Sequence, residues 1–185
     1  MKIAGRPVRW TTSSRHENDE LERETTMTNE EIAERLARLA LLMEIRGDDP
    51  FRIRAYRDAA EVIRHWPTPL AEIAREKGEE GLRQLPKVGR AISAKIMELL
   101  ERGTFATWEK LTEETPASVL DLLLVEGIGP KTAATLYRKF KIASLEDLAK
   151  FVEGGGLELI DRITPQNARK IETSLRELMK LKEER

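Results

Sequence analysis

The stretch from Leu124 to Phe140, LVEGIGPKTAATLYRKF, has residue types that can bind an anion. Gly127 and Gly129 flank an isoleucine, and Pro130 follows where the first residue of a helix is expected. Glycine lets another molecule approach the main chain closely, and proline at a first helical position gives up no hydrogen bond. The pattern therefore predicts a tight turn that presents the free N–H groups of a new helix, which is a binding site for phosphate.

The residues after this turn are basic. No aspartate or glutamate occurs between positions 127 and 144, whereas four cations do: Lys131, Arg138, Lys139 and Lys141. An anion site within a basic segment favours a nucleic-acid phosphate as the ligand. The alternative interpretation of this motif alone is a structural hairpin between two helices that requires a tight corner.

Two further segments repeat this layout in weaker form. Residues 85–90, LPKVGR, place a lysine, a valine and a glycine before a helix. Residues 162–171, RITPQNARKI, carry Arg162 and Thr164 where the first motif has glycines. Both segments contain basic residues and no acidic ones, although the helix dipole favours acidic residues in a first turn. The repetition predicts three related turn-then-helix units, with a structural role for the third and secondary contacts from Arg162 and Arg169.

The overall composition sets limits on function. Lys+Arg 32 against Asp+Glu 33 gives a net charge of -1 over 185 residues, so any DNA contact must depend on local segregation of charge. The absence of cysteine excludes disulfides and thiolate metal sites, and only two histidines are present. No apolar segment approaches the roughly 20 residues that span a bilayer, and the start lacks the apolar core of a signal peptide. We therefore expect a cytoplasmic protein.

Helix-forming residues dominate and β-branched runs are absent, which predicts an all-α fold. Thr28 and Glu31 form a capping box before the first helix, and Thr115 is expected to cap a helix that begins at Pro116. Residues 1–26 have no sustained periodicity, so we expect a disordered tail over 1–27, or a tail that rests on the domain. The spacing of apolar residues and of helix breakers predicts helices over 28–46, 50–66, 69–76, 79–84, 90–102, 108–113, 116–124, 130–140, 145–152 and 165–180.

Three motifs occur in order along the chain: FRIRAYRDAA at 51–60, LPKVGRAISAKI at 85–96 and VEGIGPKTAATLY at 125–137. On these motifs the chain, from about Thr28 to its end, resembles the N-terminal half of family X DNA polymerases, the group of DNA polymerase beta. The resemblance implies two small helical lobes built on helix-hairpin-helix motifs. A lyase-like domain would occupy residues 28–103, and a duplex-binding domain with one intact and one degenerate hairpin would occupy residues 104–185.

The resemblance also implies a function, which is binding of double-stranded DNA without sequence preference, favouring nicks, gaps or ends. Main-chain amides of the hairpins would contact phosphates, and backbone carbonyls would hold a K⁺ or Na⁺ ion. No other cofactor and no metal site made of side chains is expected. The DNA-contacting residues implied are Lys87, Val88, Gly89, Arg90, Gly127, Ile128, Gly129, Lys131 and Thr132.

In the family, a polymerase palm with metal-binding aspartates follows this region, and the sequence to Arg185 contains none. We therefore expect no polymerase activity from these residues. Repair proteins that supply catalysis are the expected partners of a bacterial, nucleoid-associated monomer. A helical adaptor that binds proteins is one alternative, because the net charge is near zero and residues 72–80 and 109–114 are acidic.

A second alternative is an abasic-site lyase. In lyase-active relatives a lysine on the helix after the first hairpin attacks C1′ of an abasic sugar, and Lys95 matches that position. The alternative for Lys95 is a solvated lysine or one that contacts a phosphate. Arg52 and Tyr56 match positions that bind a 5′-phosphate, although a tyrosine packed between helices is the structural alternative. Ala91 and Ala94 depart from the pattern, because relatives carry a phosphate-binding lysine and a glutamate there.

Overall fold

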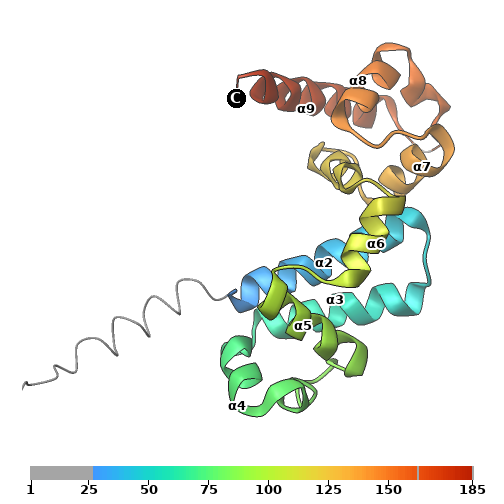
Figure 1. The fold of residues 1–185 in the computed structure, drawn as a ribbon. Helices are drawn as coiled ribbons and strands as arrows, with labels where there is room; N and C mark the ends of the chain where they lie inside the picture. Colours follow the sequence, from blue (N-terminus) through green and yellow to red (C-terminus); the bar gives the residue numbers. More distant parts are fainter. Residues whose placement is uncertain (1–26, 162, 185) are drawn as a thin grey trace, which may run out of the picture.

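The computed structural model describes residues 27–161 and 163–184. Every regular element among these residues is a helix, which confirms the predicted all-α fold (Figure 1). Of the predicted tail, all but Met27 lies outside the described residues. In chain order the elements are α2 (Asn29–Arg46), α3 (Pro50–Arg64), α4 (Leu70–Leu82), α5 (Arg90–Arg102), α6 (Ala106–Glu114), the 3₁₀ helix η1 (Ala117–Leu124), α7 (Pro130–Phe140), α8 (Leu145–Glu153), the 3₁₀ helix η2 (Gly156–Leu159) and α9 (Pro165–Glu183).

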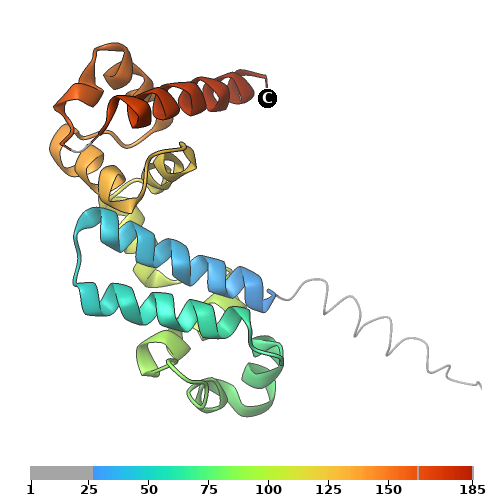
Figure 2. The same ribbon diagram turned by 180° about the vertical axis from the view of Figure 1, so that it is seen from behind.

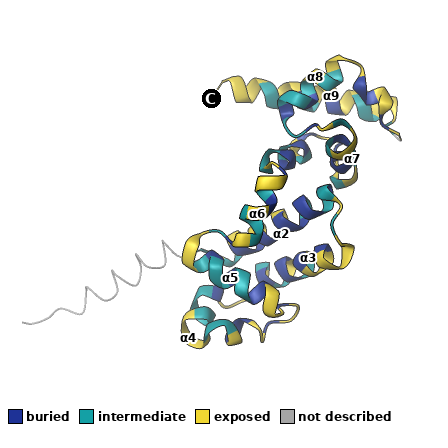
Figure 3. Cartoon of the chain, turned by 45° about the vertical axis from the view of Figure 1, so that its right-hand side comes forward, coloured by how far each residue is buried: buried dark blue, intermediate teal, exposed yellow. Residues whose placement is uncertain are grey.

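Helix α2 is the central helix of the molecule. The predicted capping box is present: the Thr28 hydroxyl accepts a hydrogen bond from the Glu31 N–H at 3.2 Å, and the Glu31 carboxylate accepts one from the Thr28 N–H at 2.7 Å. The Thr28 hydroxyl also donates to the Glu31 carboxylate at 2.9 Å. The two bonds that this carboxylate accepts, the one from the Thr28 N–H first, hold the pKa of Glu31 below its usual value. Gly47 ends the helix with a φ of 90°, which suits glycine. Figure 3 shows in dark blue the buried residues of α2, which include Ile32, Leu36 and Met43.

The first half of the chain packs around α2 and α3, which run antiparallel and side by side (Figure 2). The two short helices predicted over 69–76 and 79–84 are one element, α4, interrupted at Gly78, whose φ of 60° and ψ of -158° are not helical. Helix α5 covers the predicted range and ends at Gly103 in the left-handed conformation. The sequence signals for these breaks are therefore confirmed.

The connection between the two halves corrects one prediction. Residues 117–124 form a 3₁₀ helix, and Thr115 is a buried residue at the end of α6 that does not cap it. The apolar residues of this segment run almost without interruption from position 119 to 125, and Val119, Leu120, Leu122 and Val125 are buried.

The two halves share one continuous cluster of buried apolar side chains, which extends from Ile32 in α2 to Leu175 in α9. Helix α2 packs against α7 as well as against α3. Gly47 lies against the guanidinium of Arg138 in α7, since a Cβ at Gly47 would lie 2.7 Å from Arg138 Nη1. An ion pair of 2.6 Å between Arg46 and Glu114 also links α2 to α6. None of the described helices combines the length and apolar character required to cross a lipid bilayer.

Candidate nucleic-acid interface

The first two predicted hairpins contain the same turn. The Val88 N–H donates to the Leu85 carbonyl at 3.2 Å, and the Ile128 N–H donates to the Val125 carbonyl at 3.0 Å. The side chains of Val88 and Ile128 are buried, so each turn is anchored to the core by its middle residue. This anchor fixes the flanking main chain at the surface, where a ligand can reach it.

The backbone angles of the two turns also agree. Gly127 has a φ of 94°, and Lys87 at the equivalent position has a φ of 64°. Lys87 therefore adopts a conformation that side chains disfavour, which is the physical consequence of replacing the first glycine. Gly89 and Gly129 are extended, with φ, ψ of -87°, 179° and -98°, 179°.

The helix N-termini that follow these turns are open. No side chain caps α5 at Gly89 or α7 at Gly129, and both glycines are exposed. A Cβ added at either glycine would meet no atom within 4 Å. An anion can therefore approach the N-terminal N–H groups of both helices, where the helix dipole favours negative charge.

The third turn has the same layout and a covered terminus. The Ile163 N–H donates to the Ile160 carbonyl at 3.4 Å, and Thr164 then caps α9. The Thr164 hydroxyl accepts the Asn167 N–H at 3.2 Å, so one of the donors that an anion would use is already engaged. Arg162 lies outside the described residues, whereas Arg169 is exposed on α9.

Helix α9 supports the second hairpin. Asn167 Nδ2 donates to the Gly127 carbonyl at 3.2 Å, and the Ser174 hydroxyl accepts the Glu126 N–H at 2.9 Å. A Cβ at Gly127 would lie 2.6 Å from Asn167 Oδ1, so this glycine is packed against α9 while Gly129 is open. The role of the third turn is consistent with holding the second in place.

The first hairpin is supported by the buried side chain of Ser93 in α5. Its hydroxyl contacts Glu79 Oε1 at 2.9 Å and the Arg90 carbonyl at 3.0 Å. This contact ties the start of α5 to the second part of α4. Glu79 is therefore used internally, although it lies close in sequence to the basic segment that follows.

The charges around both hairpins are mostly basic. Arg90 and Lys131 are exposed in the first turns of α5 and α7, and neither first turn contains an acidic residue. Lys87 lies 3.7 Å from Asp58 of α3, an exposed pair worth about 0–1 kcal/mol. Glu126 is paired with Lys170 at 3.2 Å. Tertiary folding therefore brings Asp58 near the first hairpin, Glu126 adjoins the second in sequence, and each acidic residue has a basic partner.

The structure brings Lys95 and Tyr56 together. Lys95 is half-buried, its Nζ donates to the Ala91 carbonyl at 3.2 Å, and it lies 5.7 Å from the centroid of the Tyr56 ring. Tyr56 is buried, as a tyrosine packed between helices would be. Arg52 is exposed one turn earlier on α3.

Phe51 is a surface aromatic that sequence reasoning missed. It is 84% exposed in the first turn of α3, beside Arg52. It shares a helix face with Asp58, seven residues later, which contacts Lys87 of the first hairpin. The signal was available, because Phe51 falls off the spacing of Ile53, Tyr56 and the other buried residues of α3.

The described residues hold no group of three or more histidine, cysteine or acidic side chains that could bind a metal ion. Oxygen donors at the turns are instead main-chain carbonyls, such as those of Leu85 and Val125. Each accepts one N–H of its own turn. A carbonyl oxygen has a second lone pair, so these donors remain suited to a hard monovalent cation.

Comparison with known proteins agrees with this geometry. Residues 27–105 match a family described as a helix-hairpin-helix domain, and residues 119–177 match the SAM-like helix-hairpin-helix tandem. The chain is 29% identical over 127 residues to the DNA polymerase/3'-5' exonuclease PolX of Bacillus subtilis, which covers 69% of this chain and 21% of that protein. It is also 29% identical over 161 residues to DNA polymerase lambda of Rattus norvegicus, covering 82% and 26%. The chain thus matches about a quarter or less of each relative's length.

Proposed function

We propose that this chain, which carries helix-hairpin-helix domains and is homologous to family X DNA polymerases, binds the backbone of duplex DNA without sequence preference and favours nicks, gaps or ends. The observation that carries the proposal is the pair of matching turns with open, uncapped helix N-termini and basic first turns. In this proposal the protein is a nucleoid-associated monomer that acts in DNA repair beside proteins that supply catalysis.

The chemistry of the proposed contact is simple. A phosphate oxygen accepts hydrogen bonds from the main-chain N–H groups at the start of α5 or α7, and Arg90 or Lys131 supplies the neighbouring positive charge. Such contacts position a protein on the backbone and carry no sequence information. The absence of Cβ atoms at Gly89 and Gly129 permits the close approach.

The preference for interrupted DNA is supported by Phe51. An exposed aromatic ring beside an arginine can stack on a base that has lost its neighbour at a gap or an end, whereas bases in an intact duplex are already stacked. Its helix face leads towards the first hairpin. Duplex contacts by the hairpins and base stacking by Phe51 would together favour a gapped substrate.

A gel-shift experiment on intact, nicked and gapped duplexes of the same sequence tests this function. We expect binding to all three, tightest on the gap, with log K falling by about 4–5 per unit of log salt if roughly four to six phosphates are contacted. A slope near zero would contradict the proposal. So would an affinity of this protein for gapped DNA no higher than that of a control protein such as albumin, and that result would favour the protein adaptor.

The same proposal includes a K⁺ or Na⁺ ion at the hairpin carbonyls, which include those of Leu85 and Val125. A cation held there would add positive charge beside the bound phosphate. Binding to duplex DNA is then expected to be weaker in tetramethylammonium chloride than in potassium chloride of equal concentration. Equal affinities in the two salts would remove the ion from the proposal and leave the amide contacts.

A second candidate function, abasic-site lyase activity, is favoured by the position of Lys95. The amine lies beside the ring of Tyr56, with Arg52 one turn away on α3 as the proposed holder of a 5′-phosphate. In the reaction the Lys95 amine adds to the C1′ aldehyde of the open sugar, and the adduct loses water to form a Schiff base. Loss of a proton from C2′ then breaks the C3′–O bond and releases the phosphate as the leaving group.

Borohydride trapping on incised abasic DNA tests this activity, because it reduces the Schiff base to a stable protein–DNA adduct. The expected adduct forms with the wild type and is absent from Lys95→Ala. Lys110→Ala, an exposed lysine on α6, is the matched control. No adduct with the wild type, or an undiminished adduct with Lys95→Ala, would exclude Lys95 as the nucleophile while leaving the binding proposal intact.

A further inference from the structure

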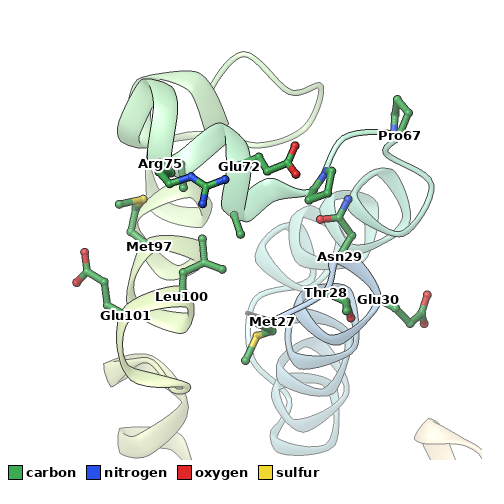
Figure 4. A pocket seen from close by; sticks show the side chains of 13 residues that line it. Met27, Thr28, Asn29, Glu30, Pro67, Glu72, Arg75, Met97, Leu100 and Glu101 are labelled. Atoms are coloured by element: carbon green, nitrogen blue, oxygen red, sulfur yellow. The ribbon is translucent and has the colours of Figure 1, made fainter. Parts of the chain in front are cut away.

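A groove of about 1040 Å³ lies between α2, α4 and α5, away from the hairpin turns. Figure 4 shows Met97 and Leu100 of α5 on one side of this groove and Met27 and Asn29 at the start of α2 on the other, with α4 between them. Ala71 and Ala74 of α4 and two prolines complete the apolar lining. A groove of this size with apolar walls can accommodate a peptide segment.

The polar side chain in the wall of the groove is already satisfied. Asn29 Nδ2 donates to the carbonyls of Trp66 and Thr68 at 3.1 and 3.0 Å, and its Oδ1 accepts the Leu70 N–H at 2.8 Å. Asn29 therefore holds the wall together and has little capacity left for a ligand. The groove therefore presents apolar surface to a ligand, with charged side chains at its rim.

The rim of the groove is acidic. Glu30, Glu72 and Glu101 line it, against a single cation, Arg75. Glu30 is paired with Arg64 at 2.9 Å, which leaves Glu72 and Glu101 as the rim carboxylates that form no ion pair within the described residues. The groove therefore fits a segment that combines apolar side chains with positive charge.

The sequence contains such a segment ahead of Met27, the first described residue that lines the groove. Residues 1–16, MKIAGRPVRWTTSSRH, carry four cations and no acidic residue, together with the apolar side chains of Ile3, Val8 and Trp10. They lie outside the described residues, and the chain that follows them enters the structure at Met27, which itself lines the groove. A tethered segment has a high effective concentration at a nearby site.

We propose that this groove binds residues 1–16 of the same chain, with Trp10 in the apolar part and the cations against Glu72 and Glu101. Trp10 is the natural anchor, because a tryptophan gains more from burial than the other side chains of the segment. The acidic residues 17–24 would then form the connection to Met27. This inference concerns a surface without a hairpin and is independent of the DNA-binding proposal.

Photo-crosslinking of the full chain tests the inference. Benzoylphenylalanine replaces Trp10, labelled and unlabelled chains are mixed, and the crosslinked peptides are identified by mass spectrometry in the absence of DNA. The expected crosslinks join Trp10's position to peptides containing Met27, Met97 or Leu100 within one chain. Glu101→Lys is expected to reduce their yield about two- to fivefold. Glu113→Lys, exposed on α6, is expected to leave it unchanged.

Each other result overturns the inference. Crosslinks scattered over other surfaces, or no crosslinks, mean that the groove does not bind the segment. Crosslinks to the groove only between labelled and unlabelled chains mean that a second copy is the occupant. A parallel reaction contains added duplex DNA. If the segment crosslinks to that DNA and never to the groove, it is a DNA-binding arm.

Discussion

Gly127 and Gly129 lie two residues apart and have different functions in the second hairpin. Gly127 is needed by the fold, because its φ is positive and its α-carbon is packed against Asn167 and Ile171. Gly129 has an extended conformation that any residue adopts, and the space beside it is open. The fold alone does not require glycine at position 129, which is the expected pattern for a residue that admits a ligand.

Alanine substitutions separate these two roles. Gly127→Ala is expected to lower the free energy of unfolding by about 1–3 kcal/mol, because it adds strain and a steric clash. For Gly129→Ala, the free energy of unfolding is expected to lie within about 0.5 kcal/mol of the wild-type value. This variant is expected to bind duplex DNA several-fold more weakly, because the methyl group covers the main-chain amides. Urea unfolding and gel shifts measure the two effects. Wild-type DNA affinity in Gly129→Ala would contradict the interface.

Lys87 combines a strained backbone with a useful charge. Lys87→Gly and Lys87→Ala both remove one cation, so each is expected to reduce the slope of log K against log salt by about 0.9. The two differ in the backbone, because only glycine adopts the positive φ without strain. Lys87→Gly is therefore expected to be more stable than Lys87→Ala by about 1 kcal/mol in urea unfolding. Equal stabilities would mean that the turn rearranges in the variants.

At the scale of elements, the helices that follow the turns differ in how their N-termini are satisfied. Helices α5 and α7 have no side-chain cap, whereas Thr164 caps α9 and the capping box caps α2. A cap stabilises a helix by using a free N–H group, and a helix without a cap leaves that group for a ligand. Helices α4 and α6 also have no side-chain cap, but Asn29 and Glu98 accept the first N–H group of each, at Leu70 and Ala106. The N-termini of α5 and α7 therefore differ from these in being left open for the proposed contacts.

The capping box of α2 predicts a dependence of stability on pH. Hydrogen bonds from Thr28 lower the pKa of Glu31 from its usual 4.5, so the folded state binds the proton less readily than the unfolded one. This contribution is fully present above pH 4.5 and is lost as the pH falls through the lowered pKa. Wild type is expected to be more stable than Glu31→Gln at pH 7 and no more stable at pH 3.

Urea midpoints at the two pH values measure this difference. Glu34→Gln, at an exposed position of the same helix outside the capping box, is the matched control and is expected to follow the wild type. A difference between wild type and Glu31→Gln that persists unchanged at pH 3 would show that the charge of Glu31 is not its source.

At the scale of the whole molecule, α2 connects the two hairpins. It packs against α3, beside the first hairpin, and against α7, which begins at the second. One continuous cluster of buried side chains joins these helices. The relative position of the two proposed DNA contacts therefore depends on the packing of α2 rather than on a flexible linker.

Truncation of the α2 core is expected to weaken both halves together. Leu36 is fully buried, and Leu36→Ala is expected to cost about 2–5 kcal/mol through lost burial and a cavity. Hydrogen exchange should show equal losses of protection for the amides of α3 and α7. If α7 kept its protection while α3 lost it, the two halves would be separate cooperative units. Glu34→Gln serves as the surface control.

The helices were predictable from the sequence, because their boundaries depend on local signals. Thr28 with Glu31, Pro50, Gly103 and Pro130 mark helix ends through caps and backbone angles that act within one turn. The hairpin turns were predictable for the same reason. The 3₁₀ form of residues 117–124 was not predicted, because the apolar residues from Val119 to Val125 are nearly continuous and show no distinct period.

Tertiary structure alone decided what surrounds each turn. No local signal shows that Gly127 is packed on Asn167, that Asp58 approaches Lys87, or that Lys95 lies over Tyr56. These contacts join residues far apart in sequence, and they depend on how helices with similar apolar faces pack around α2. The sequence therefore determined which residues form the turns, and packing decided which of their groups remain open to a ligand.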